Sequence, residues 1–169
     1  PERKVRVIQP FAGTGFGAGT ALCPEPYACL LAMKAGAPVK LVLSRKEDFQ
    51  IRTTRENIAR IEMKLGVKKD GTLVAQRIRA INNAGAYRGS GVVVIFLAWG
   101  FTMIPYRIPN LKYEGLSVYT NHTVRAPQRG HGAPKVRFAI ESQLDMIAEA
   151  LGIDPITIRL RNARQPQEL

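Results

Sequence analysis

Two glycine-rich segments carry the residues whose types and spacing best suit ligand chemistry. The first glycine loop is Gly13-Thr-Gly-Phe-Gly-Ala-Gly19, and the second glycine loop is Gln128-Arg-Gly-His-Gly-Ala-Pro134. Glycine has no Cβ, so a ligand can come close to the main chain, and backbone N–H groups can then donate hydrogen bonds to a bound oxygen or phosphate. We therefore expect both segments to be ligand-binding loops.

The first glycine loop also allows a different interpretation, as the fingerprint of a dinucleotide-binding oxidoreductase domain of the NADP type. Gly13-x-Gly15-x-x-Ala18 follows an expected strand, and Arg45 follows the next one. In that fold, however, Pro24 and Pro26 would lie inside a helix, where a proline costs about 3 kcal/mol or more. This interpretation stays an alternative, as does a basic interaction module without catalytic activity.

The composition indicates a globular and strongly basic chain. Of its 169 residues 46% are apolar, and 25 Lys+Arg against 13 Asp+Glu give a formal net charge of +12. A basic chain favours anionic partners. The cations are scattered and do not alternate with aromatic residues, so we expect no nucleic acid and assign part of the charge to contacts with the rest of a larger protein.

Two further features concern the environment of the chain. The only cysteines are Cys23 and Cys29, whose spacing predicts neither a disulfide framework nor a zinc site, so we expect buried thiols in the reduced cytoplasm. The longest apolar run, 92–99, is far shorter than the roughly 20 residues of a membrane span. We expect no membrane span, and we expect both ends of the chain to have been cut from a longer polypeptide.

The elements that must position the loops follow from hydrophobic periodicity. We expect strands at 4–8, 39–43, 58–67, 72–84 and 112–120, and helices at 27–34, from 44, at 134–151 and after Asp154. The apolar segment 91–101 could be a buried helix or a buried strand, and its length favours the helix. The turn Lys68-Lys-Asp-Gly71 predicts an antiparallel hairpin. The helix at 134–151 should turn Phe138, Leu144, Ile147 and Leu151 inward. The sum is an α+β fold, a two-layer sandwich of a mixed or antiparallel sheet with helices packed on it, either one domain or two small lobes at 1–56 and 57–169.

Several motifs occur in one order along nearly the whole chain. They include both glycine loops, Pro24-Glu-Pro26, Ala35-Gly-Ala-Pro-Val39, Tyr106-Arg-Ile-Pro-Asn110 and Leu151-Gly-Ile-Asp-Pro155. In this order they resemble the molybdopterin-binding region of the large subunit of the molybdenum hydroxylases, the xanthine dehydrogenase and aldehyde oxidase family. The resemblance implies that the chain is a fragment of that subunit.

The resemblance also implies a cofactor and the residues that bind it. The cofactor is a molybdenum-pterin, with the cytosine dinucleotide form as one option. Gly15, Phe16, Gly17, Arg129 and Gly130 match cofactor-binding positions, and the main chain at Phe16 and Arg129 matches positions near the molybdenum ligands. No catalytic residue is expected in this fragment, because the base glutamate of the family should lie beyond Leu169. Iron-sulfur clusters and FAD are expected on partner subunits or domains.

The expected substrate is a small molecule, and the positions that match the family's substrate pocket are His131, Thr20 and Leu97. Purine-oxidising members carry a glutamate and an arginine where this chain has Thr20 and Leu97, which disfavours a purine. An aldehyde, an aromatic heterocycle or an aryl-CoA fits better. The enzyme would hydroxylate it, or would dehydroxylate it reductively, because Arg129-Gly-His-Gly132 resembles 4-hydroxybenzoyl-CoA reductase. The full-length protein is expected to be a molybdenum-dependent oxidoreductase, and the fragment alone is expected to be inactive.

Overall fold

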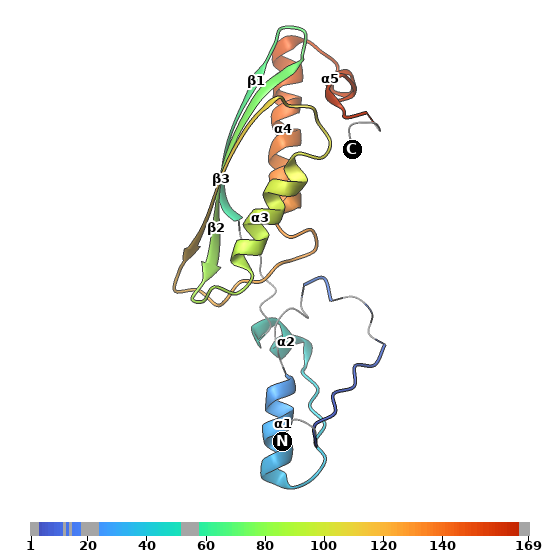
Figure 1. Ribbon diagram of the computed structural model, residues 1–169, viewed down its shortest axis with the longest axis vertical. Helices are drawn as coiled ribbons and strands as arrows, with labels where there is room; N and C mark the ends of the chain where they lie inside the picture. Colours follow the sequence, from blue (N-terminus) through green and yellow to red (C-terminus); the bar gives the residue numbers. More distant parts are fainter. Residues whose placement is uncertain (1–3, 12, 14, 18–23, 52–57, 166–169) are drawn as a thin grey trace.

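A three-stranded sheet with helices on one face forms the larger part of the molecule (Figure 1). The computed structural model describes residues 4–11, 13, 15–17, 24–51 and 58–165. The helices among these residues are α1 (Glu25–Ala35), α2 (Arg45–Ile51), α3 (Gly91–Thr102), α4 (Ala133–Leu151) and α5 (Pro155–Asn162), and the strands are β1 (Ile58–Val67), β2 (Leu73–Gly85) and β3 (Asn110–Tyr119). The N-terminal segment, with α1 and α2, lies beyond one end of the sheet. The predicted α+β fold is confirmed.

The sheet is mixed, with the strand order β1-β2-β3. β1 and β2 form the predicted antiparallel hairpin, whereas β3 runs parallel to β2 after the crossover through α3. In the hairpin turn, Gly71 adopts a φ of 87°, which favours glycine, and its N–H donates to the carbonyl oxygen of Lys68 at 2.9 Å. The Asp70 carboxylate accepts hydrogen bonds from the N–H and the hydroxyl of Thr72, both at 3.0 Å.

The core lies between the sheet and helices α3 and α4. Alternate residues of β2 point into it, and Ile78 and Ala80 are almost fully buried. α4 contributes a stripe at a spacing of four residues, formed by Val136, Ile140, Leu144 and Ala148. The amphipathic helix is thus confirmed, but the prediction that Phe138 faces inward is wrong, because its side chain is 75% exposed. At 100° per residue, position 138 is turned by roughly 200° from position 136 and so lies on the opposite side of the helix.

The N-terminal segment contains the two predicted helices. α1 is followed by the C-cap residue Gly36, which adopts a φ of 62° in the left-handed region. α2 begins with the predicted capping box, in which the Ser44 N–H donates to Glu47 Oε2 at 2.8 Å and the Glu47 N–H donates to Ser44 Oγ at 3.3 Å. The Glu47 carboxylate also accepts from the Ser44 hydroxyl, and this bond lowers the pKa of Glu47.

Other predictions for this segment are wrong. Residues 4–8 and 39–43 form no strand, because among the described residues no sheet edge pairs with them. Cys29 is exposed rather than buried, since α1 buries no residue in the described part of the chain. Cys23 lies outside the described residues.

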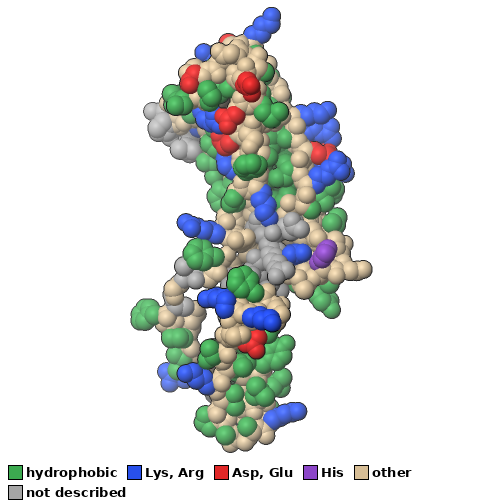
Figure 2. All heavy atoms as spheres, turned by 180° about the vertical axis from the view of Figure 1, so that it is seen from behind, with side chains coloured by type: hydrophobic (Ala, Val, Ile, Leu, Met, Phe, Trp, Pro, Cys, Tyr) green, Lys and Arg blue, Asp and Glu red, His purple; other side chains and the backbone are tan. Residues whose placement is uncertain are grey.

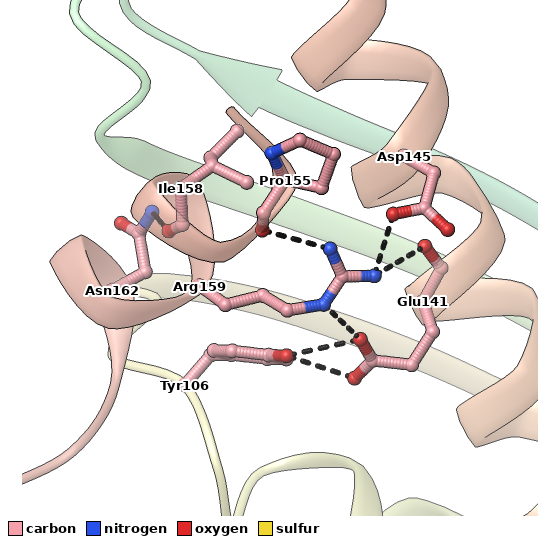
Figure 3. Close-up of polar contacts among 7 residues, drawn as sticks. All are labelled: Tyr106, Glu141, Asp145, Pro155, Ile158, Arg159 and Asn162. Carbon is pink, nitrogen blue, oxygen red and sulfur yellow. Dashed lines mark hydrogen bonds and ion pairs between the residues drawn. The ribbon is translucent and has the colours of Figure 1, made fainter. Parts of the chain in front are cut away.

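Polar contacts attach α5 to the rest of the fold (Figure 3). The guanidinium of Arg159 donates from Nε to Glu141 Oε2 at 2.8 Å, and its Nη2 lies 2.8 Å from Asp145 Oδ1 on α4. The Tyr106 hydroxyl donates to the same Glu141 carboxylate at 2.9 Å. Asp154 is the N-cap residue of α5, and its carboxylate accepts from the Thr157 N–H at 2.8 Å.

The far end of α5 is tied to the hairpin by the buried side chain of Asn162. Its amide Nδ2 donates to the carbonyl oxygen of Gly71 at 2.9 Å, and its Oδ1 accepts from the Leu73 N–H at 2.9 Å. Together with Arg159, this residue holds α5 against both α4 and the sheet.

Candidate functional site

The two glycine loops lie against each other, although they are far apart in the sequence. The backbone N–H of Arg129 donates a hydrogen bond to the carbonyl oxygen of Phe16 at 3.0 Å. The guanidinium carbon of Arg129 lies 5.6 Å from the centroid of the Phe16 ring, within the range of a cation–π contact. The structure therefore brings Phe16 and Arg129, the two residues whose main chain is predicted to lie near the metal, into direct contact.

Gly17 makes this contact possible because it has no side chain. It adopts a φ of 111°, and a Cβ at this position would lie 1.9 Å from the carbonyl oxygen of Pro127. No side chain fits there, so the main chains of the two loops touch only because residue 17 is glycine. Gly13, in the same loop, shows no such constraint, because a Cβ there would have nothing within 4 Å.

Backbone strain is found at one non-glycine residue of each loop. Among the described residues, Phe16 with a φ of 50° and His131 with a φ of 47° are the non-glycine residues of positive φ. The left-handed conformation costs an L-residue roughly 1–2 kcal/mol, and such residues cluster at ligand-binding and active sites. Gly130 and Gly132, on either side of His131, adopt φ values of 92° and 85°.

The second glycine loop presents main-chain donors beside the start of a long helix. The N–H of His131 donates to the carbonyl oxygen of Gln128 at 2.7 Å, and that of Ala133 donates to Gly130 at 3.0 Å. Within the part of the chain that the structure describes, the N–H of Gly130 has no hydrogen-bond partner. The positive end of the α4 dipole lies at this loop, so the loop suits a bound oxygen or phosphate.

The second glycine loop also packs closely on α3. A Cβ on Gly132 would lie 2.9 Å from the carbonyl oxygen of Val94 and 3.1 Å from the Cβ of Ala98. Leu97 and His131 are both predicted substrate-pocket residues. Leu97 is half-buried on α3, and His131 lies in the second glycine loop, which packs on α3. Thr20, the third predicted pocket residue, lies outside the described residues.

A surface depression of about 390 Å³ adjoins the second glycine loop. It is lined mostly by apolar atoms of Phe101, Ile104, Gly130, Ala133, Pro134 and Arg137. Nη2 of Arg137 donates to the carbonyl oxygen of Phe101, which links α4 to the end of α3. The sequence analysis missed Phe101 and Arg137. A helical signal pointed to Arg137, because it follows Pro134 by three residues and so shares a face of α4 with it.

Side-chain metal ligands do not gather in the described part of the chain. No three or more His, Cys, Asp or Glu side chains among these residues form a group that could hold a metal ion. The helices of the same residues include none that is long and apolar enough to cross a membrane.

Known protein families and curated relatives match almost the whole chain. The molybdopterin cofactor-binding domain family matches residues 1–163. The chain is 43% identical over 162 residues to the xanthine dehydrogenase molybdenum-binding subunit of Escherichia coli O157:H7, covering 94% of this chain and 21% of that protein. It is 38% identical over 165 residues to the nicotinate dehydrogenase large molybdopterin subunit of Eubacterium barkeri, covering 98% of this chain and 39% of that protein.

Solved structures share the fold. The aldehyde oxidoreductase from Desulfovibrio gigas has a TM-score of 0.82 at 34% identity, over 92% of this chain and 17% of that one. Quinoline 2-oxidoreductase from Pseudomonas putida has a TM-score of 0.81 at 31% identity, over 95% of this chain and 21% of that one. The chain thus spans only a minor part of the length of each of these relatives.

Proposed function

The chain belongs to the molybdopterin cofactor-binding domain family, and from this premise we propose that its two glycine loops together hold one side of the molybdenum-pterin cofactor. The resemblance to the molybdenum hydroxylases is confirmed by the family match and by the relatives. The alternatives, a dinucleotide-binding domain and a basic module without catalytic activity, receive no support from these likenesses.

The contact between Phe16 and Arg129 carries the proposal. It joins main chains from two loops, and Gly17 keeps the junction free of a side chain. Phe16 lies at this contact and His131 lies two residues after Arg129. Both have a strained backbone, which lowers the stability of the fold and is typical of ligand-binding sites. An unpaired main-chain donor at Gly130, among the residues that the structure describes, suits an oxygen of the cofactor, so the residues present fit a ligand of this kind.

Each proposed cofactor residue has a role that follows from its geometry. Gly17 lets the main chains of the two loops meet. Gly15, which has no side chain, would leave room for the cofactor beside the first loop, and the Gly130 N–H at the start of α4 would donate to a cofactor oxygen. The main chain at Phe16 and Arg129 would lie near the molybdenum ligands, and the contact between these two residues fixes the spacing of the two loops. When bound, the cofactor supplies two-electron oxidation and reduction, while this chain binds and orients it.

We further propose that the full-length protein is an oxidoreductase whose substrate is an aldehyde, an aromatic heterocycle or an aryl-CoA. Among the relatives, nicotinate dehydrogenase and quinoline 2-oxidoreductase are named for aromatic heterocycles other than purines and aldehyde oxidoreductase for an aldehyde, whereas the xanthine dehydrogenase subunit is named for a purine. His131 and the α3 residue Leu97 would face this substrate, together with Thr20. The surface depression beside Gly130, which Phe101 and Arg137 help to line, would extend this substrate pocket.

The rest of the enzyme would complete the site. We propose that the base glutamate and the remaining pterin contacts come from the rest of the molybdenum subunit, and that iron-sulfur and flavin subunits or domains accept the electrons. The cytosine dinucleotide form of the pterin and a cytoplasmic location belong to the same proposal, as does a division into lobes at 1–56 and 57–169. In support of that division, none of the described residues before Ile58 is buried.

Elemental analysis of the full-length protein tests the proposal. We expect stoichiometric molybdenum, together with a fluorescent pterin after oxidation and acid release, and turnover of an aldehyde or heterocycle with an artificial electron acceptor. A cleanly folded, active protein without molybdenum would contradict the proposal. The 169 residues alone should bind cofactor weakly and turn nothing over, so robust turnover by them would contradict the assignment of the base to the rest of the enzyme.

A further inference from the structure

Among the residues that the structure describes, no helix packs on one face of the sheet. α3 and α4 pack on the opposite face (Figure 1), and alternate residues of all three strands point away from them. We call this surface the outer charged face; it consists of Arg60, Glu62, Lys64, Arg77, Arg79, Lys112 and Glu114. Figure 2 shows Lys and Arg side chains gathered along the sheet side of the molecule, with few acidic side chains between them.

The strand register arranges these charges in rows across the sheet. Lys64 pairs with Arg77, and Arg77 pairs with Lys112, so one row holds three cations. In the neighbouring row Arg79 lies between Glu62 and Glu114. Like charges directly opposite each other destabilise a sheet, so a row of three cations has a cost that a partner's carboxylates would relieve.

The two carboxylates of the outer charged face are already shared among its cations. Glu114 lies 3.3 Å from Lys112 Nζ and 3.4 Å from Arg77 Nη2, and Arg79 Nε lies 3.9 Å from it. Glu62 lies 2.8 Å from Arg60 Nε and 3.9 Å from Arg79 Nη1. Five cations against two carboxylates leave a surplus of three positive charges, which the residues of this face do not neutralise.

The surroundings of the outer charged face favour a polypeptide over a nucleic acid. A depression of about 490 Å³ with mainly apolar walls adjoins it around Gly66 and Ala75, and Leu116 and Val118 continue β3 on the same side, 43% and 40% exposed. Exposed apolar patches bordered by polar and charged groups mark protein interaction sites. The outward positions just named include no aromatic residue for base stacking, and Glu62 and Glu114 would repel phosphates.

We propose that the outer charged face is the docking surface for an acidic surface of another polypeptide, whose carboxylates pair with the row formed by Lys64, Arg77 and Lys112. Three strands about 4.8 Å apart and about ten residues long cover roughly 450 Å² in projection. That is less than the about 800 Å² per partner of a standard interface, so the contact is weak and depends on salt. It goes beyond the cofactor site and does not rest on it.

The test uses the full-length protein and a fluorescently labelled oligoglutamate peptide as probe. Fluorescence anisotropy should show saturable binding at low salt that weakens by about tenfold at physiological salt. Arg77→Glu, at the centre of the cation row, should weaken binding at least as much. Lys34→Glu makes the same change in net charge on the exposed surface of α1 and should leave binding unchanged. Lys112→Glu, on the edge strand β3, should reproduce the loss if Arg77→Glu impairs folding.

Three results would overturn the proposal. Equal weakening by Lys34→Glu and Arg77→Glu would show a response to net charge alone. Absence of peptide binding by the well-folded full-length protein would show that its own chain covers the face. Tighter binding of a single-stranded oligonucleotide than of the peptide, abolished by Arg77→Glu, would make nucleic acid the occupant.

Discussion

The main chains of Phe16 and Arg129 are joined by a hydrogen bond of 3.0 Å, and the guanidinium of Arg129 lies over the ring of Phe16. This pair closes the two glycine loops into one surface. Gly17 permits the closure, since any side chain there would overlap the carbonyl oxygen of Pro127. The proposed cofactor site therefore depends on a backbone junction, and the following predictions test that junction and the elements that support it.

Gly17→Ala should separate the loops, because its Cβ would lie 1.9 Å from the Pro127 carbonyl oxygen and residue 17 has a φ of 111°. We expect the full-length variant to lose most of its molybdenum, by about tenfold or more, since positioning errors of an ångström carry penalties of that order. Elemental analysis and thermal unfolding are the measurements. Gly13→Ala is the matched control, because a Cβ there meets nothing within 4 Å; equal molybdenum loss in both variants would contradict the role of Gly17.

His131→Gly should relieve backbone strain, because residue 131 has a φ of 47°. Removing a left-handed L-residue gains roughly 1–2 kcal/mol, and the added chain entropy of glycine costs roughly 0.5–1 kcal/mol. We expect stability to be unchanged or slightly raised, whereas the affinity for substrate falls. His122→Gly, at an exposed residue without positive φ, should only destabilise. Denaturant unfolding compares the two variants, and a loss of stability in His131→Gly as large as in His122→Gly would show that the strain is absent.

Arg159→Ala should destabilise the fold by about 2 kcal/mol, the size of a lost set of charged hydrogen bonds. The change leaves the partly buried Glu141 without its cation and frees α5 from α4. Denaturant unfolding gives the value. Arg161→Ala is the control, since the ion pair of Arg161 with Asp70 is long, at 3.9 Å, and such exposed pairs contribute little. Similar losses for both arginines would refute the role of Arg159 in holding α5.

Tyr106 should make stability fall at alkaline pH. Burial and the hydrogen bond to Glu141 raise the pKa of Tyr106 from 10.0 to about 12. Because the folded pKa is the higher one, this contribution is complete below pH 10 and is lost as the pH rises through 12. Tyr106→Phe should flatten the fall of the unfolding free energy across this window. Some slope should remain, since burial also raises the pKa of Tyr113 to about 12; an unchanged slope would contradict the assignment.

The parts of the fold that depend on short-range sequence motifs could be predicted. The hairpin at Asp70-Gly71 and the capping box at Ser44 and Glu47 follow from short-range backbone chemistry, and the structure confirms both. The prediction of strands at 4–8 and 39–43 was wrong. A strand-like sequence shows only that a segment could join a sheet, and it does not provide a neighbouring strand with which the segment can pair. Phe138 was misplaced because helix phase was judged from its hydrophobicity, although Val136 and Ile140 define the buried stripe.

The candidate site could be predicted only in its parts. The glycines marked both loops, and their resemblance to one family suggested a common ligand. Sequence spacing could not show that the Arg129 N–H meets the Phe16 carbonyl, since this contact depends on how the N-terminal segment lies against the sheet. Positive φ at Phe16 and His131 was equally hidden, because a positive φ is uncommon for any residue other than glycine.

Amide hydrogen exchange in the full-length protein, compared between its cofactor-loaded and cofactor-free forms, tests the central claim most directly. We predict that loading protects the amides of Gly15 to Gly17 and of Arg129 to Gly132 together, while the hairpin turn at Lys68 to Gly71 exchanges at the same rate in both forms. Protection of only one loop, or of neither, would contradict a cofactor site formed jointly by the two.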